Sequence, residues 1–202
     1  MAGPDGTYRV RVGSQEFDIP LVEIADDLTI ALLISVDLGV GFAERAGAEL
    51  AIELAPYDPE IVVSVATMGI PLAIEVTRHL GLDDYVILHK TPKTHLGDTF
   101  AEPVRSITTG APQMLRLDPA RVSAVRGRRV AVVDDVISTG ASTLAALNLV
   151  RQVDADPVVI GALVTEGSGW RTMLGPDAAN VRALGAMPVF RTSGQGLVED
   201  WG

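Results

Sequence analysis

The chain has 202 residues and a formal net charge of −10, from 16 Lys and Arg against 26 Asp and Glu. A domain of this length buries about 70% of the surface of its unfolded chain, so its fold needs no disulfide or metal staples. It contains no cysteine, which excludes disulfides, thiolate nucleophiles and thiolate zinc sites. The acidic excess argues against nucleic acid as a partner, because a duplex repels a negatively charged protein.

The sequence also predicts no membrane contact. The longest nearly unbroken apolar run, Leu28 to Val36, is about half as long as the 18 or more residues that a membrane-spanning helix needs. The first residues have no basic flank leading into an apolar stretch, so we expect no signal peptide. We therefore expect a soluble, cytoplasmic protein whose residues 1–202 form a single domain.

The first predicted elements are a β-hairpin and a helix. Apolar and charged residues alternate from Tyr8 to Val12, and Gly13-Ser14 separates this run from the apolar positions of Phe17 to Ile19. Leu28 to Val36 is apolar and partly β-branched. Apolar residues then recur at helical spacing from Phe42 to Leu54, where nearby prolines end the helix.

The rest of the chain alternates short apolar strands with helices. The predicted strands are Ile61 to Val65, Tyr85 to Leu88, Val130 to Val133 and Val158 to Val164, and the predicted helices are Pro71 to Leu80 and Ala141 to Val150. Strands rich in β-branched residues suit burial on both faces. Such alternation implies crossover connections and a parallel sheet covered by helices on both faces, so the expected fold class is α/β.

One segment, from Lys90 to Gln113, departs from this alternation. It contains prolines, glycines and several threonines, and it has no hydrophobic period. A structureless stretch of this length inside a domain is often a functional lid, so we expect a mobile arm here. An ordinary surface excursion is the alternative.

The most informative segment is AVVDDVISTGAST, from Ala131 to Thr143. It is predicted to be a buried strand that ends in two carboxylates and is followed by a turn of small hydroxylated residues opening a helix. The start of a helix offers unpaired backbone N–H groups and a positive dipole end, and both attract a phosphate. One of the hydroxyls is expected to cap the helix. A cap does not explain three hydroxyls around a glycine.

The two carboxylates, Asp134 and Asp135, need partners of their own. Burial of a carboxylate at a strand end is costly without hydrogen-bond donors or a cation. Because adjacent strand residues point to opposite faces, both face one ligand only if the chain turns there. At the carboxyl end of a parallel sheet, sugar hydroxyls and hydrated Mg²⁺ meet the need for partners. The pattern therefore predicts a phosphorylated ribose as ligand.

This segment resembles the phosphoribosyl-pyrophosphate (PRPP) binding signature of the type I phosphoribosyltransferases, and the order of elements is similar from about Phe42 to Phe190. Within that family the chain is most similar to the adenine and xanthine enzymes. The resemblance implies a parallel sheet flanked by helices, a mobile hood arm over about residues 90–113, and small hood elements at both chain ends. It also implies a homodimer.

The resemblance assigns roles to individual residues. The 5′-phosphate loop would consist of Val136, Ile137, Ser138, Thr139, Gly140, Ala141 and Ser142. Asp134 and Asp135 would hold the ribose hydroxyls, directly or through Mg²⁺. The pyrophosphate loop would consist of Ala66, Thr67, Met68 and Gly69, and Lys90 would stand beside the pyrophosphate. Val104 to Gly110 resembles the end of the hood arm.

The implied reaction is displacement of pyrophosphate from C1 of PRPP by a ring nitrogen of a purine base, with Mg²⁺ as cofactor. Lys90, the metal and the backbone amides of the pyrophosphate loop would stabilise the charge that grows on the leaving group. A closed arm would exclude water, which otherwise hydrolyses PRPP.

Some residues depart from the family pattern. Ala66, Thr67 and Met68 stand where adenine enzymes often carry an acidic and a basic residue, and Thr108 to Gly110 is more like the xanthine branch. Instead of the lysine of xanthine enzymes, this chain offers Glu166 as an acceptor for base N–H groups and Trp170 as a stacking partner. Adenine is the first expected base. A xanthine- or guanine-type enzyme and a non-catalytic PRPP- or nucleotide-sensing regulator are the alternatives.

Overall fold

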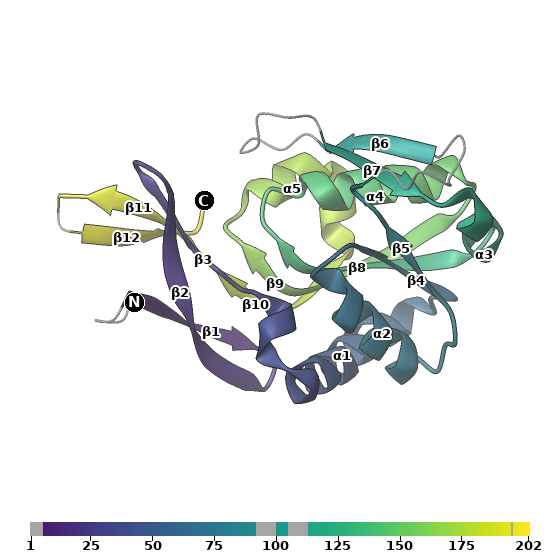
Figure 1. Ribbon diagram of the computed structural model, residues 1–202, viewed down its shortest axis with the longest axis horizontal. Helices are drawn as coiled ribbons and strands as arrows, with labels where there is room; N and C mark the ends of the chain where they lie inside the picture. The colour runs from purple at the N-terminus through teal and green to yellow at the C-terminus, as the bar shows by residue number, and fades with distance from the viewer. Residues whose placement is uncertain (1–5, 92–99, 105–112, 195) are drawn as a thin grey trace.

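The computed structural model describes residues 6–91, 100–104, 113–194 and 196–202, and Figure 1 shows their arrangement. These residues form three sheets, of five, five and two strands. The strands are β1 (Thr7–Val12), β2 (Gln15–Ala25), β3 (Leu28–Ala31), β4 (Ile61–Val65), β5 (Tyr85–Leu88), β6 (Phe100–Val104), β7 (Gln113–Leu117), β8 (Arg129–Ile137), β9 (Asp156–Glu166), β10 (Val181–Met187), β11 (Val189–Ser193) and β12 (Gly196–Asp200). The α-helices are α1 (Val40–Leu54), α2 (Gly69–His79), α3 (Val122–Val125), α4 (Ala141–Gln152) and α5 (Gly169–Leu174).

The central sheet is parallel, in the order β10-β9-β8-β4-β5. Every residue of β4 is buried, and its side chains alternate between two hydrophobic clusters. Ile61 and Val63 belong to a cluster with Leu149 of α4. Val62 belongs to a second cluster with Leu50 of α1 and with α2. The alternation of side chains along a strand thus places α4 on one face of the sheet and α1 and α2 on the other.

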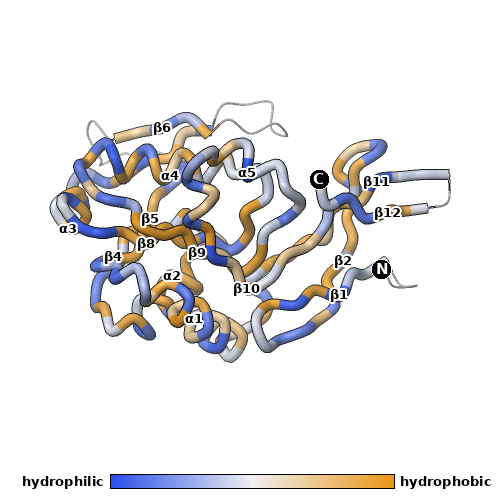
Figure 2. The backbone as a smooth tube through the Cα atoms, turned by 180° about the vertical axis from the view of Figure 1, so that it is seen from behind, coloured by the Kyte–Doolittle hydropathy of each residue, from blue (hydrophilic) through white to orange (hydrophobic). Residues whose placement is uncertain are grey.

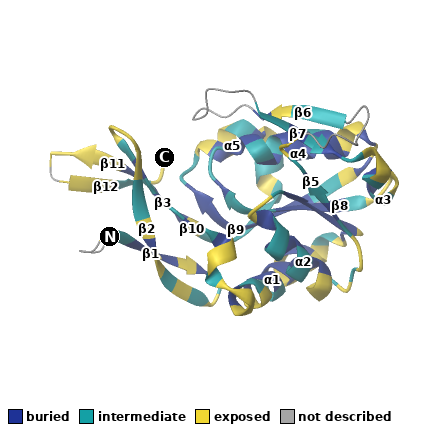
Figure 3. Cartoon of the chain, in the orientation of Figure 1, coloured by how far each residue is buried: buried dark blue, intermediate teal, exposed yellow. Residues whose placement is uncertain are grey.

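The colours of Figures 2 and 3 follow these two layers. The tube of the inner strands β4, β8 and β9 is largely hydrophobic in Figure 2, and these three strands are mostly buried in Figure 3, whereas the edge strand β10 is mostly of intermediate exposure. Helix α1 alternates buried and exposed positions along its length, as a helix with one apolar face does. Within the described ranges, no helix combines the length and hydrophobicity that crossing a bilayer requires.

The second sheet joins the two ends of the chain. Its order is β1-β2-β3-β11-β12, and its pairs are antiparallel. Val189 of β11 pairs with Ile30 of β3, and Tyr8 of β1 stacks edge-on against Phe190 of β11 with ring centroids 5.4 Å apart. This sheet lies beside the carboxyl ends of the central strands (Figure 1), as the hood elements of the resemblance imply.

The fold class and most predicted elements are confirmed. The hairpin pairs Val10 with Phe17, and the four predicted strands and three predicted helices all form, with ends that differ by a few residues. The prediction of an arm without regular structure is wrong at Phe100–Val104, because this stretch pairs with β7 and Phe100 packs on the core. The remaining parts of the predicted arm, residues 92–99 and 105–112, lie outside the described residues.

Two glycines of α1 provide a test of the packing between α1 and α2. A Cβ on Gly47 would lie 2.3 Å from Cβ of Glu75 on α2, so Gly47→Ala must push the helices apart. We expect this variant to lose about 1–3 kcal/mol of unfolding free energy in urea denaturation. Gly41→Ala is the matched control, because its Cβ would meet only the Arg45 side chain at 3.5 Å. The control should gain up to about 1 kcal/mol from helix propensity; equal effects would contradict the packing.

Candidate active site

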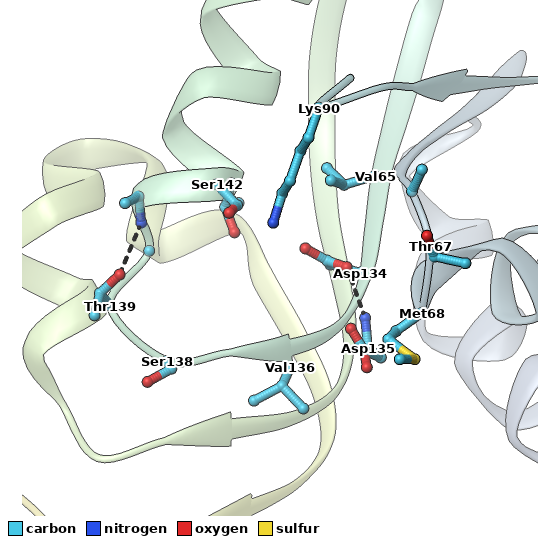
Figure 4. Close-up of a pocket in the computed structure, with 14 residues that line it drawn as sticks. Val65, Thr67, Met68, Lys90, Asp134, Asp135, Val136, Ser138, Thr139 and Ser142 are labelled. Atoms are coloured by element: carbon cyan, nitrogen blue, oxygen red, sulfur yellow. Dashed lines mark hydrogen bonds between the residues drawn. The ribbon is translucent and has the colours of Figure 1, made fainter. Parts of the chain in front are cut away.

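A cavity of about 210 Å³ opens at the carboxyl ends of β4 and β8 (Figure 4). Three segments enclose it: the turn from β4 to α2, the turn from β8 to α4, and the segment that follows β5. Its lining residues are Val65, Ala66, Thr67, Met68, Lys90, Asp134, Asp135, Val136, Ser138, Thr139, Gly140, Ala141, Ser142 and Thr143. The structure therefore brings together most of the residues predicted for the site.

The acidic pair lies on the part of β8 that extends past its neighbour. The last pair between β4 and β8 joins Ser64 to Val133, whereas β8 continues to Ile137. At Asp134 and Asp135, β8 therefore has no neighbour on the β4 side. Both residues line the cavity although they lie within the strand, whereas the sequence analysis expected this only if the chain turned there. Asp134 Oδ1 accepts the Asp135 backbone N–H at 3.0 Å.

The electrostatics of this pair favour protonation. Burial, followed by the charge of Asp135, raises the pKa of Asp134 well above its ordinary value, and the Lys90 charge opposes this shift. Burial also raises the pKa of Asp135. Hydrogen bonds, first with the Asp134 side chain and last with Ser35, lower it in part. Two neighbouring carboxylates in such surroundings gain from donors or a cation that approaches through the cavity.

The turn from β8 to α4 has the form of an anion site. Gly140 adopts the left-handed conformation, with φ of 80°, and directly precedes the 12-residue helix α4. Thr139 Oγ1 accepts the Ala141 N–H at 3.3 Å, but the N-cap residue is Gly140, so the expected capping hydroxyl is not present at that position. The hydroxyls of Ser138 and Ser142 line the cavity. Of the predicted phosphate loop, Ile137 alone does not line this cavity; its side chain is buried in the core.

Trp170 packs against this turn at Gly140. A Cβ on Gly140 would lie 3.3 Å from Cα and Cβ of Trp170, so the two segments are in close contact. The indole N–H donates to the carbonyl of Gly167 at 3.1 Å, and the side chain is only 2% exposed. Trp170 lines neither this cavity nor the larger one beside it, so we assign it to packing rather than to a base.

The turn from β4 to α2 forms the opposite wall. The peptide bond between Ala66 and Thr67 is cis, and Thr67 and Met68 are exposed. Gly69 begins α2, is buried, and does not itself line the cavity. A Cβ there would lie 2.4 Å from Ser64 Oγ and 3.1 Å from Asp134 Oδ1. The glycine therefore allows α2 to begin directly against the acidic pair.

Ser35 is a residue that the sequence analysis missed. It lies in the short helical turn Ser35–Leu38 between β3 and α1, and its Oγ donates to the Met68 carbonyl at 3.0 Å. The same Oγ lies 3.4 Å from Asp135 Oδ2. Ser35 thus connects the β4–α2 turn to the acidic pair. A serine inside an apolar run carries no signal of this role, because the contact joins residues 100 positions apart.

Lys90 reaches the cavity from the segment after β5. Figure 4 shows its ammonium group directed between Asp134 and Ser142. His89 and Arg116 exchange backbone hydrogen bonds of 3.0 and 2.9 Å. Arg116 Nη1 also donates to the Lys90 carbonyl at 3.0 Å. Arg116, which the sequence analysis did not single out, therefore holds the backbone that presents Lys90.

A second, larger cavity of about 600 Å³ adjoins the first, and Ser138 and Thr139 line both. Its other walls come from the end of β9, from α5, and from β3 and β11 of the second sheet. Glu166 lies in its wall and is 5% exposed. Burial raises the pKa of Glu166, against a hydrogen bond with Ser138.

Comparisons with known proteins agree with this geometry. Residues 43–177 match the phosphoribosyl transferase domain. The chain belongs to this family. The type I phosphoribosyltransferase fold, predicted from the residues around Asp134, is therefore confirmed, and its similarity to a solved enzyme extends over most of the chain. The adenine phosphoribosyltransferase of Rhodothermus marinus superimposes with a TM-score of 0.63 at 20% identity, covering 91% of this chain and 95% of that one.

The relatives found by sequence include an enzyme and a regulator. The xanthine phosphoribosyltransferase of Laribacter hongkongensis is 26% identical over 65% of this chain and 64% of its own length. The transcriptional regulator GfcR of Methanosarcina mazei is 30% identical over 52% of this chain and 45% of its own length. The match thus spans about half to two thirds of the length of these curated relatives. A phosphoribosyltransferase domain alone therefore leaves both activities open.

Ser35→Ala tests the hydrogen bond from the Ser35 hydroxyl to the Met68 carbonyl. Loss of the hydroxyl leaves the Met68 carbonyl without this donor, so we expect the unfolding free energy to fall by about 1 kcal/mol in urea denaturation. Ser123→Ala is the control, because Ser123 is exposed on α3. The control should change stability by less than about 0.5 kcal/mol. An equal, small effect in both variants would show that the Ser35 contact contributes nothing.

Glu166→Gln tests the burial of that carboxyl group. A raised pKa means that the folded state keeps the proton to a higher pH than the unfolded state, so Glu166 lowers stability as pH rises above its ordinary value of 4.5. We expect the variant to match the wild type near pH 4 and to be increasingly more stable toward pH 7.5 in thermal or urea unfolding. Glu44→Gln, at an exposed position of α1, should follow the wild-type profile. A constant difference across this range would contradict the shift.

Proposed function

We propose that this protein transfers the 5-phosphoribosyl group of PRPP to a purine base, with adenine as the preferred base, and releases pyrophosphate in nucleotide salvage. One observation carries the proposal: a single cavity joins an acidic pair to the start of a helix whose hydroxyls and backbone N–H groups suit a phosphate. A 5-phosphoribosyl group presents a phosphate at one end and a diol near the other. The cavity offers complementary groups for both.

In this proposal each wall binds one part of PRPP. The turn from Val136 to Ser142 binds the 5′-phosphate, with the hydroxyls of Ser138 and Ser142 as donors. Asp134 and Asp135 accept hydrogen bonds from the ribose hydroxyls. The turn Ala66 to Met68 presents its backbone to the pyrophosphate, and Lys90 approaches from the side of β5. Gly69 contributes only by allowing the close approach of α2.

The transfer exchanges one bond at C1 of the ribose for another. The bond from C1 to the pyrophosphate oxygen breaks, a ring nitrogen of the base bonds to C1, and the ring N–H proton passes to solvent. Negative charge grows on the pyrophosphate oxygen while C1 becomes positively charged. Lys90 and the backbone amides of the β4–α2 turn stabilise the leaving group, and the carboxylates lie on the side of the positive sugar.

The residues present fit the Mg²⁺ that this reaction uses. Asp134 and Asp135 supply carboxylate oxygens, which Mg²⁺ prefers. The described residues contain no group of three or more His, Asp or Glu side chains placed to hold a metal. This donor set suits an ion that keeps its waters and binds through substrate oxygens as well. When bound, Mg²⁺ neutralises charge on the pyrophosphate.

We further propose that the protein works in the cytoplasm as a homodimer. The absence of cysteine is compatible with a reducing compartment but does not require one. Val40 and Ile52 of α1 are 81% and 71% exposed, which is apolar surface that a second copy could cover. Light scattering with size-exclusion chromatography measures the mass directly.

A regulator without transfer activity is the second candidate. The match to a transcriptional regulator favours it, as does a β4–α2 turn whose residues Ala66, Thr67 and Met68 carry no ionisable side chain. Such a protein would bind PRPP or a nucleotide and release no pyrophosphate. A xanthine- or guanine-type enzyme is the alternative within the catalytic class, and the match to a xanthine enzyme favours it.

An assay of adenine, guanine, hypoxanthine and xanthine with PRPP and Mg²⁺ separates these candidates. We expect pyrophosphate release, fastest with adenine. Asp135→Asn should lower kcat/KM for PRPP by at least about tenfold, because a carboxylate hydrogen bond contributes about 1.5–3 kcal/mol. Asp83→Asn, at an exposed position of the loop before β5, is the control and should behave as the wild type. PRPP binding without turnover of any base would favour the regulator.

A further inference from the structure

The hydroxyl group of Ser35 lies between two acceptors on different walls of the smaller cavity. Its Oγ is 3.0 Å from the Met68 carbonyl oxygen and 3.4 Å from Asp135 Oδ2. A serine hydroxyl carries one proton, so Ser35 donates fully to one of these acceptors at a time. Ser35 is buried and lines neither of the two cavities, so it acts on a ligand only through these two neighbours.

The demand of Asp135 for this proton depends on what the cavity holds. A carboxylate attracts a hydroxyl proton more strongly than a neutral carbonyl group does, so an Asp135 carboxylate without other donors competes with Met68 for Ser35. Asp135 lines the cavity, where sugar hydroxyls and metal-bound waters are donors for its oxygens. A ligand at the acidic pair therefore leaves the Ser35 proton to the Met68 carbonyl.

The Met68 carbonyl group in turn fixes the start of α2. Met68 directly precedes this helix, and its carbonyl belongs to the same planar peptide group as the N–H of Gly69. A hydrogen bond that holds the carbonyl therefore also sets the direction of that N–H, which has no partner within the helix. Met68 lines the cavity together with Ala66 and Thr67, so the order of this turn decides how its backbone faces an anion.

We infer that Ser35 is a positioning residue that couples the two sides of the smaller cavity, so that a sugar diol bound at the acidic pair strengthens pyrophosphate binding at the β4–α2 turn. This inference rests on the proposed function, which assigns these two sides to the ribose and the pyrophosphate. Because such coupling is reciprocal, pyrophosphate strengthens binding of the sugar by the same factor. PRPP carries both groups in one molecule and thus benefits from the coupling, whereas a compound with one group meets a less ordered turn.

A purely structural role for Ser35 makes a different prediction. If the hydroxyl only stabilised the fold, its removal would change the affinity for pyrophosphate by one factor, whether or not a sugar is bound. Coupling instead changes the ratio of the pyrophosphate affinities with and without the sugar, and this ratio cancels any uniform effect. The ratio is therefore the quantity that distinguishes the two roles.

Titration calorimetry of pyrophosphate measures this ratio, with and without the saturating C1-deoxy analogue of ribose 5-phosphate, at one concentration of free Mg²⁺. This analogue keeps the phosphate and the diol, and without a hydroxyl at C1 it leaves room for pyrophosphate. We expect the ratio to fall at least about threefold in Ser35→Ala, as the loss of one hydrogen bond implies. Thr77→Val is the matched control and should keep the wild-type ratio, because Thr77 Oγ1 also donates to a backbone carbonyl, that of Ala73 at 2.6 Å, inside α2.

The outcomes distinguish the inference from the proposed function. An unchanged ratio in Ser35→Ala overturns the inference and leaves the transferase proposal intact, as does an equal fall in Thr77→Val. Mutual exclusion of the two compounds in the wild type also overturns the inference. Failure of the wild type to bind either compound overturns the inference and the proposed function together. Ser35→Cys replaces the hydroxyl with a weak donor and should lower the ratio in the same direction, so the test does not depend on one variant.

Discussion

The candidate site depends on an offset between two neighbouring strands. Strand β4 ends at Val65, whereas β8 continues to Ile137. Past the last shared pair, β8 has a neighbour on one side only, so Asp134 and Asp135 face a cavity instead of a continuous sheet. The same extension delivers the chain to Gly140, where α4 begins and its first-turn N–H groups point out of the helix end. One backbone feature thereby places both carboxyl groups beside the N-terminal end of a helix.

Residues remote in the sequence hold this arrangement in place. Ser35 reaches from the turn before α1 to Met68 and Asp135, and Arg116 reaches from β7 to the backbone of Lys90. Gly69 allows α2 to start within contact distance of Asp134. None of the three needs to touch a ligand. They hold in place the backbone segments that carry the cavity-lining groups, and such support gives a binding site its geometry.

The two cavities are built by different parts of the fold. The smaller cavity lies at the carboxyl ends of the central parallel strands, and the side chains that line it include Lys90, Asp134 and Asp135. The larger cavity is completed by Leu28, Ile30 and Val189, which come from the two ends of the chain. Because different elements shape the two cavities, changes in the sheet that joins the chain ends can alter the larger cavity without changing the β8–α4 turn. Membership of the family therefore does not by itself fix what the larger cavity binds.

The sequence by itself determined the parallel α/β sheet and the turn of small hydroxylated residues that follows the acidic pair, because strand burial, helix period and glycine conformation are local properties that residues 61–150 express directly. It placed most of the lining residues, but it assigned Trp170 to a base when the indole packs beneath Gly140. Only the tertiary structure decided that Ser35 and Arg116 support the site, that Phe100–Val104 is a strand, and that the Glu166 carboxyl group is buried with one oxygen unpaired. Each of these outcomes depends on contacts between distant segments, and no local pattern of residue types records such a contact.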